Sequence, residues 1–202
     1  MTKRAAVIDY DLGNLPSVTK ALERIGVDPV IVDAPDGLDD ELDAVILPGV
    51  GHFGAGARNL ADRRLDEPLK EWARAGKPLL GICVGLQLFF ARSEEDPDAK
   101  GLGIVDGEVR RLKAAKVPLM GWTTLDVSLN AKVLRAVAPD DYAYFVHSYY
   151  VDPDPSIVAA TATYEHEFCA AIEAGNVVGT QFHPEKSADV GRRVLRRFFD
   201  TL

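Results

Sequence analysis

Residues 78–91 read PLLGICVGLQLFFA, an apolar run in which two glycines each stand two positions from Cys83. The run predicts a short buried strand over residues 78–82 and the start of a helix over residues 85–91. Cys83 then lies on a strand-to-helix turn, where the nearby glycines permit a tight backbone that most side chains would block. This is the pattern of a nucleophile elbow with sulfur in place of oxygen, and a helix N-terminus beside the sulfur favours the reactive thiolate. Because cysteine is also a common buried hydrophobe, the pattern alone leaves packing as an alternative.

The strand before Cys83 is one of several that alternate with helices in the first half of the chain. Strands are expected at residues 5–9, 29–32, 44–47 and 78–82, and the apolar helix faces are Val18, Ala21, Leu22 and Ile25, then Leu65, Leu69, Trp72 and Ala73. Such alternation predicts a parallel sheet covered by helices. Short strands with Gly and Pro punctuation follow from residue 103 to residue 180, which predicts antiparallel additions. We therefore expect one α/β domain over residues 1–202, with a mostly parallel central sheet flanked by helices and extended by antiparallel strands.

An amphipathic helix is expected to close the chain. Ser187 is its predicted N-cap. Its predicted buried face is Val190, Val194, Leu195 and Phe198. The arginines between these positions are expected to form a solvated face.

Composition narrows the classes of function. The chain of 202 residues is 47% hydrophobic and 27% charged, as folded globular proteins are. Its net charge of −8 argues against a nucleic-acid or membrane surface. Cys169 is expected to pack inside a strand, and a working thiolate at Cys83 suits the reducing cytoplasm. We expect no signal peptide, because the first residues pass directly into a strand, and no apolar run is long enough to span a membrane. We expect neither a metal nor a cofactor.

A second motif, Gln181-Phe182-His183-Pro184-Glu185-Lys186, follows an apolar run near the C-terminus. Proline favours an extended conformation at His183, and residues two apart in an extended segment point to the same side. His183 and Glu185 are therefore predicted to form a base and the carboxylate that orients it. Together with Cys83 they make the constellation of covalent acyl transfer, although a surface turn is an alternative explanation of the motif alone.

A glycine-rich loop, Pro48-Gly49-Val50-Gly51-His52, follows the apolar strand at residues 44–47. It lacks the ending of a P-loop and the spacing of a dinucleotide fingerprint. Its backbone N–H groups at Gly49, Val50 and Gly51 are candidates for one side of an oxyanion hole, with the N–H of Val84 as the other donor. Ordinary turn chemistry is the alternative.

These segments resemble those of class I glutamine amidotransferases, which have a Cys-His-Glu triad. Within that family the chain most resembles the glutaminase subunits of imidazole glycerol phosphate synthases. The segments that carry the resemblance are residues 8–15, 48–53, 81–90, 101–109, 117–122, 144–150 and 183–185. The Pro-Gly-Val-Gly loop and the Phe-Val-His-Ser-Tyr segment point to this branch, because several sister glutaminases carry Pro-Gly-Gly at the first.

The resemblance implies a fold, a reaction and contacts. It implies glutamine hydrolysis through a cysteinyl thioester, with the ammonia passed to a (β/α)8-barrel cyclase subunit that makes imidazole glycerol phosphate in histidine biosynthesis. It implies substrate contacts at Gln87, Glu95, His147, Ser148 and Tyr149, with Glu94 as an alternative to Glu95. It implies partner contacts at Asn14, Trp122, Tyr144 and Lys186.

Three positions depart from the family pattern and concern the partner-facing surface. Asp11 replaces a common glycine, Leu119 a common histidine, and Thr123 a common asparagine. The alternatives are a sister glutaminase that serves pyridoxal phosphate or anthranilate synthesis, a cysteine peptidase or stress-response hydrolase on a similar sheet, and an inactive interaction subunit.

Overall fold

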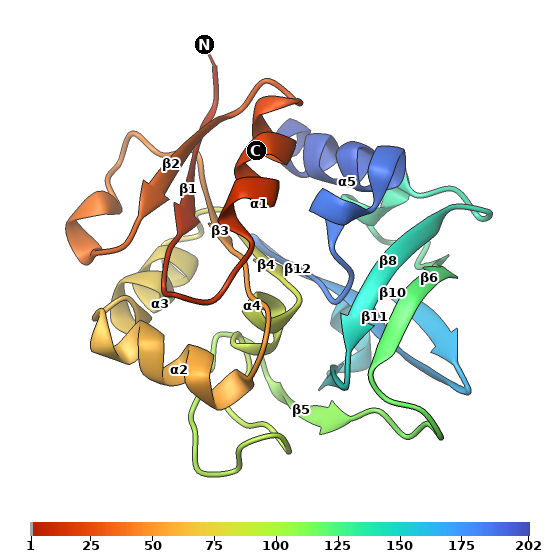
Figure 1. Cartoon of the computed structure of the whole chain (residues 1–202). Coiled ribbons are helices and arrows are strands. Elements are labelled where there is room, and N and C mark those ends of the chain that lie inside the picture. Colours follow the sequence, from red (N-terminus) through yellow and green to blue (C-terminus); the bar gives the residue numbers. More distant parts are fainter. Residues whose placement is uncertain (1) are drawn as a thin grey trace.

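The computed structural model describes residues 2–202 and is built around a ten-stranded mixed sheet (Figure 1). Five strands form its parallel part in the order β2-β1-β3-β4-β12. These are β1 (Arg4–Ile8), β2 (Asp28–Val32), β3 (Ala44–Leu47), β4 (Leu79–Ile82) and β12 (Val177–Thr180). Beyond β12 the sheet continues with antiparallel strands, namely β11 (His166–Ala174), β10 (Val158–Tyr164) and β7 (Asp126–Val127), with β9 (Tyr149–Pro153) and β5 (Gly107–Arg111) as a side branch. The mostly parallel α/β fold with antiparallel additions is confirmed.

Helices cover both faces of the parallel strands. Figure 1 shows α1 and α5 together on one face and α2 and α3 on the other. Their bounds are α1 (Leu15–Glu23), α2 (Phe53–Asp62), α3 (Asp66–Arg74), α4 (Val84–Gln87) and α5 (Ala188–Asp200), with short 3-10 turns η1 (Pro35–Gly37), η2 (Leu134–Ala136), η3 (Pro155–Ile157) and η4 (Pro184–Lys186). A separate two-stranded ribbon pairs β6 (Leu119–Thr124) with β8 (Tyr142–His147).

The helix expected over residues 85–91 is wrong beyond its first turn. Helix α4 ends at Gln87, and the carbonyls of Leu88 and Phe89 accept hydrogen bonds from residues 102, 104 and 105 instead of continuing a helix. The segment is buried on all sides, so no polar face favours a longer helix.

Helix α5 has the predicted buried face, which Phe199 extends. Ser187 stands at its N-cap position but makes no capping bond. Its hydroxyl instead donates to the carbonyl of His183 at 2.7 Å and accepts from the N–H of Tyr144 at 2.9 Å. The predicted cap is therefore wrong in its contacts, because the side chain joins η4 to β8.

Within residues 2–202, no helix is both long and apolar enough to cross a membrane. In the same part of the chain, no group of three or more His, Cys, Asp and Glu side chains is arranged to hold a metal ion.

Candidate active site

Cys83 lies on a tight turn between β4 and α4. Its backbone is in a sparsely populated region, with φ 53° and ψ −108°, and such strain is held at functional turns by the surrounding structure. A Cβ on Gly81 would stand 2.7 Å from the backbone nitrogen of Leu86, and one on Gly85 would stand 1.8 Å from the carbonyl oxygen of Leu47. The two glycines are therefore required by close backbone approach, which is how the sequence builds this turn.

His183 and Glu185 form a buried pair whose Nδ1 and Oε1 atoms are 2.7 Å apart. His183 is extended, but Glu185 lies in η4, so the turn and not strand alternation brings the carboxylate to the ring. Since the carboxylate accepts, Nδ1 carries the proton and Nε2 is the atom left for exchange. Burial favours the neutral ring, but contacts with Cys83 and Glu185 outweigh it and raise the pKa of His183 to about 9.

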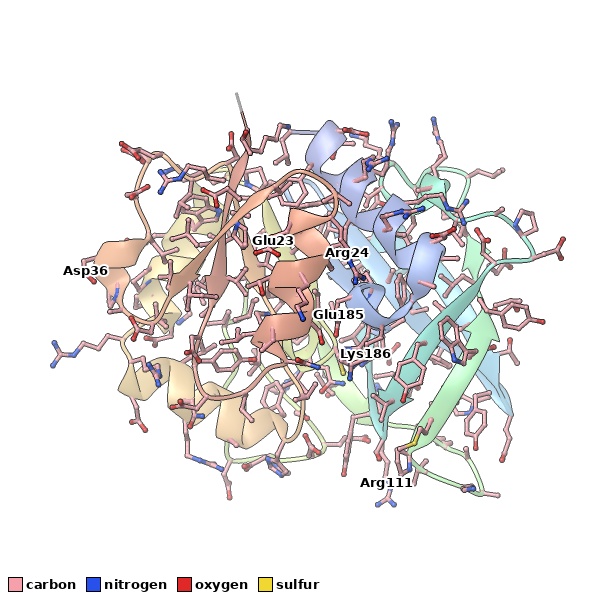
Figure 2. All side chains as sticks on the ribbon, turned by 45° about the horizontal axis from the view of Figure 1, so that its top comes forward. Glu23, Arg24, Asp36, Arg111, Glu185 and Lys186 are labelled. Atoms are coloured by element: carbon pink, nitrogen blue, oxygen red, sulfur yellow. The ribbon has the colours of Figure 1, made fainter. Side chains whose placement is uncertain are left out.

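The turn η4 lies between several elements, which fixes the positions of its side chains. It contacts α1, α5 and β8, and Figure 2 shows Glu185 between α1 and α5 while Lys186 lies toward β8. The backbone N–H of His183 donates to the carbonyl of Tyr144 at 2.9 Å. His183, the predicted base, is thereby tied to β8 as well as to the end of β12.

The glycine-rich loop at residues 48–52 packs directly against the turn at Cys83. The N–H of Val84 donates to the carbonyl of Gly49 at 3.4 Å. The hydroxyl of Tyr10, which is fully buried, donates to the carbonyl of Pro48 at 2.6 Å. The N–H of Val84, a predicted oxyanion donor, is thus already bonded to the loop. The distance of 3.4 Å makes this hydrogen bond weak.

A cavity of about 240 Å³ opens beside the sulfur. Its walls are formed by Val50, Gly51, Cys83, Val84, Gln87, Glu95, Pro118, Val146, His147, Ser148 and Tyr149. All five expected substrate contacts therefore line the same cavity as Cys83, the predicted nucleophile. A larger cavity of about 520 Å³ lies beside β7, away from Cys83.

Glu95, and not Glu94, stands at this cavity. Its Oε2 accepts from the N–H of Phe53 at 2.6 Å, whereas Glu94 accepts from the N–H of Arg111 at 2.7 Å. Glu95 is therefore the carboxylate of the two that is placed to meet a ligand in this cavity.

His147 is buried and neutral. Its Nδ1 lies 2.9 Å from the carbonyl oxygen of Tyr149, so Nδ1 carries the proton. Burial lowers its pKa to about 4, although the hydrogen bond to Tyr149 acts in the opposite direction. The ring therefore presents the lone pair of Nε2, and not a charge, to its surroundings.

Gln181 is a buried residue at the sulfur that sequence reasoning missed. Its Nε2 lies 3.6 Å from Cys83 Sγ, and its Oε1 accepts from Gln87 Nε2 at 3.1 Å. Gln87 Nε2 also donates to the carbonyl of Tyr149 at 2.9 Å. The sequence feature that could have identified Gln181 is its position, since it is a polar residue directly after an apolar strand and two residues before the predicted base.

The expected partner residues lie apart from the cavity, mostly around the β6–β8 ribbon. The rings of Trp122 and Tyr144 are 5.7 Å apart, and Lys186 Nζ lies 6.0 Å from the ring centre of Tyr144. Trp122 is half exposed, and Met120 on the same strand is exposed over about two thirds of its surface. Asn14 caps α1 by accepting from the N–H of Ser17 at 3.3 Å.

The three departures from the family pattern have different surroundings. Asp11 has φ 62°, a conformation that glycine adopts readily and Asp tolerates, and it pairs with Arg63 at 2.7 Å. Thr123 is partly exposed on β6. Leu119 is buried and stands opposite His147 in the β6–β8 pair.

Residues 6–202 match the family model of class-I glutamine amidotransferases. The chain belongs to this family. Several curated relatives are named imidazole glycerol phosphate synthase subunit HisH. The one from Carboxydothermus hydrogenoformans is 47% identical over 97% of this chain and 98% of the relative. The one from Microcystis aeruginosa is 46% identical over 96% of this chain and 93% of the relative. The corresponding protein of Rhodopirellula baltica is 44% identical over 95% of each chain.

Solved structures share this fold across nearly the whole chain. The PurLQS structure from Thermotoga maritima aligns with a TM-score of 0.80 at 22% identity and covers 100% of this chain and 99% of that one. A structure described as a glutamine amidotransferase aligns with a TM-score of 0.77 at 19% identity and covers 96% and 97%. At these identities the likeness concerns the fold alone.

Proposed function

We propose that this chain is the glutaminase subunit of an imidazole glycerol phosphate synthase. The observation that carries the chemistry is an elbow cysteine that lines a cavity at the end of β4, where the neighbouring strand β12 leads into a buried His–Glu pair. The observation that favours this branch of the family is identity of 43–47% to HisH relatives over nearly the full length of both chains. The substrate is glutamine.

In this mechanism the Cys83 thiolate attacks the side-chain carboxamide carbon of glutamine. His183 accepts the thiol proton and passes a proton to the departing ammonia, while Glu185 holds the imidazole by its Nδ1–H. A glutamyl thioester forms, and water hydrolyses it to glutamate, returning the electron pair of the C–S bond to sulfur. The proposed contacts to the glutamine backbone groups are Gln87, Glu95, His147, Ser148 and Tyr149.

The oxyanion hole is the proposed point of control. Its donors are the N–H of Val84 and an N–H from residues 49–51, and one such donor contributes about 3 kcal/mol in the transition state. The carbonyl of Gly49 occupies the Val84 donor in this conformation. The Gly49-Val50 peptide must therefore turn before the tetrahedral oxyanion can be stabilised.

The proposed partner is a (β/α)8-barrel cyclase subunit that receives the ammonia and produces imidazole glycerol phosphate and an aminoimidazole carboxamide ribonucleotide. Exposed aromatic residues on the β6–β8 ribbon, next to the base-bearing turn, support docking there. We propose Asn14, Trp122, Tyr144 and Lys186 as contacts. A cytoplasmic location fits the need for a reduced thiol at Cys83.

Glutamate release measured for the chain alone, then with the cyclase and its nucleotide ligand, tests the proposal. We expect low basal activity and a steep rise only in the full mixture. Cys83→Ala should abolish the stimulated activity. High activity that is indifferent to the cyclase would instead favour a sister glutaminase.

A further inference from the structure

Gln181 is a fully buried polar residue that the proposed chemistry does not use. It follows β12, and the pairing of Thr180 with Ile82 across β12 and β4 puts it beside Cys83. Its own N–H donates to the carbonyl of Ala170 at 2.8 Å, which fixes its backbone. The side chain reaches the sulfur from this fixed position, with 3.6 Å between Nε2 and Sγ.

The direction in which the Gln181 amide faces is set by a chain of contacts. A side-chain amide can present either its N–H groups or its oxygen to a neighbour. The carbonyl of Tyr149 can only accept, so Gln87 must turn its Nε2 toward it. The other N–H of Gln87 then meets Gln181 Oε1 at 3.1 Å. Gln181 is therefore left with its own N–H groups toward the sulfur.

We propose that Gln181 is a catalytic residue that donates a hydrogen bond to the Cys83 thiolate, and that Gln87 is a positioning residue that holds this donor in the required orientation. The inference rests on the proposed function of Cys83. An N–H donor favours the thiolate over the thiol, because the thiolate carries the full negative charge that the donor stabilises. Since no proton leaves the amide, Gln181 supplies this stabilisation without taking part in proton transfer.

The same donor serves two steps of the reaction. It faces the thiolate before attack on the carboxamide carbon. It faces the thiolate again when water has added to the thioester and the C–S bond breaks with its electron pair returning to sulfur. Loss of the donor should therefore lower kcat more than it changes KM for glutamine.

The orientation of Gln87 also decides which of its atoms can bind substrate. Both N–H groups of Gln87 are engaged by Tyr149 and Gln181, so its oxygen is the atom left to face the cavity. An oxygen accepts from the α-ammonium group of glutamine and does not bind its α-carboxylate.

Alkylation by iodoacetamide at neutral pH tests the proposal, because the thiolate is the reactive form. In Gln181→Met, which keeps the side-chain length without the donor, the rate at Cys83 should fall roughly tenfold, and kcat should fall with KM little changed. Peptide mass spectrometry separates Cys83 from Cys169. Cys169 is an internal reference, because burial raises its pKa to about 12 and should keep its labelling slow in both proteins.

Two further variants distinguish loss of the hydrogen-bond donor from a general loss of folding. Gln181→Glu keeps the shape and the oxygen that faces Gln87 but presents an acceptor to the sulfur, and should lower both rates. Gln87→Met leaves Gln181 in place but removes its orientation, and should cause a smaller loss. Wild-type alkylation and kcat in a folded Gln181→Met protein, verified by its melting temperature, would overturn the proposal. Stimulated glutamine hydrolysis that survives in Cys83→Ala would instead overturn the proposed function of Cys83 itself.

Discussion

Replacement of Glu185 by glutamine removes the buried charge that faces His183 while keeping the shape and one hydrogen-bond acceptor. Burial works against the charged ring, but Cys83 and Glu185 together raise the pKa of His183 from 6.5 to about 9. That difference corresponds to about 3 kcal/mol in favour of the charged imidazole in the folded state. Because Cys83 supplies part of it, the Glu185→Gln variant should lose on the order of 1–2 kcal/mol of its free energy of unfolding at low pH.

The pH dependence has a definite sign. A histidine whose pKa is higher in the folded chain than in the unfolded chain contributes stability that is fully present below pH 6.5. This contribution is lost as the pH rises through about 9, the folded-state value. The difference between wild type and variant should therefore be largest in mildly acidic buffer and smallest in alkaline buffer.

Urea unfolding followed by circular dichroism at several pH values measures this difference. Glu71→Gln is the matched control, since Glu71 is exposed on α3, and it should show no difference at any pH. A difference between wild type and Glu185→Gln that stays constant with pH, or grows as the pH rises, would refute the reasoning. The same variant should also lose most of its stimulated glutaminase activity, because a neutral amide stabilises the imidazolium less than a carboxylate does.

Three other substitutions test the surroundings of the site. A Cβ at Gly49 would stand 2.5 Å from the hydroxyl of Tyr10 and 2.7 Å from the nitrogen of Gly85, so Gly49→Ala should lower the free energy of unfolding by about 1–3 kcal/mol in urea titrations. Tyr10→Phe leaves the buried carbonyl of Pro48 without its donor and should cost about 1–2 kcal/mol in the same assay; unchanged stability would contradict the assigned bond. Trp122→Ala should weaken cyclase binding roughly tenfold or more in calorimetric titrations, whereas Leu129→Ala, which removes an exposed apolar residue beside the larger cavity, should not.

Periodicity and buried apolar runs were sufficient to predict the parallel strands and the main helices. Strands β1 to β4 begin and end within one residue of their predicted limits, because each is an apolar run bounded by turn residues. The length of α4 was not predictable in this way. Residues 88–90 are as apolar as a helix core would be, and what ends the helix is a set of hydrogen bonds from residues 102–105.

The sequence identifies the candidate side chains of the site more readily than it predicts the orientations of the amide and carbonyl groups around them. Cys83, His183 and Glu185 stand in recognisable motifs, and the contact between the last two follows from a local turn. The direction of the Gln181 amide depends on Tyr149 and Gln87, which are distant in sequence. The orientation of the Gly49 carbonyl depends on a peptide rotation that changes no residue, so the pattern that predicted the oxyanion loop carries no information about its state.

The parallel pairing of β4 with β12 also bears on when activity arises during synthesis. Cys83 and His183, the proposed nucleophile and base, are a hundred residues apart in the chain, yet the strands that precede them, β4 and β12, are direct neighbours in the sheet. Contacts of such long range form late, after the intervening segments have been made and folded. A growing chain on the ribosome therefore carries the thiol for about half of its synthesis without the histidine that is proposed to activate it. Hydrolysis of cellular glutamine must wait until the C-terminal segment has emerged and β12 has paired.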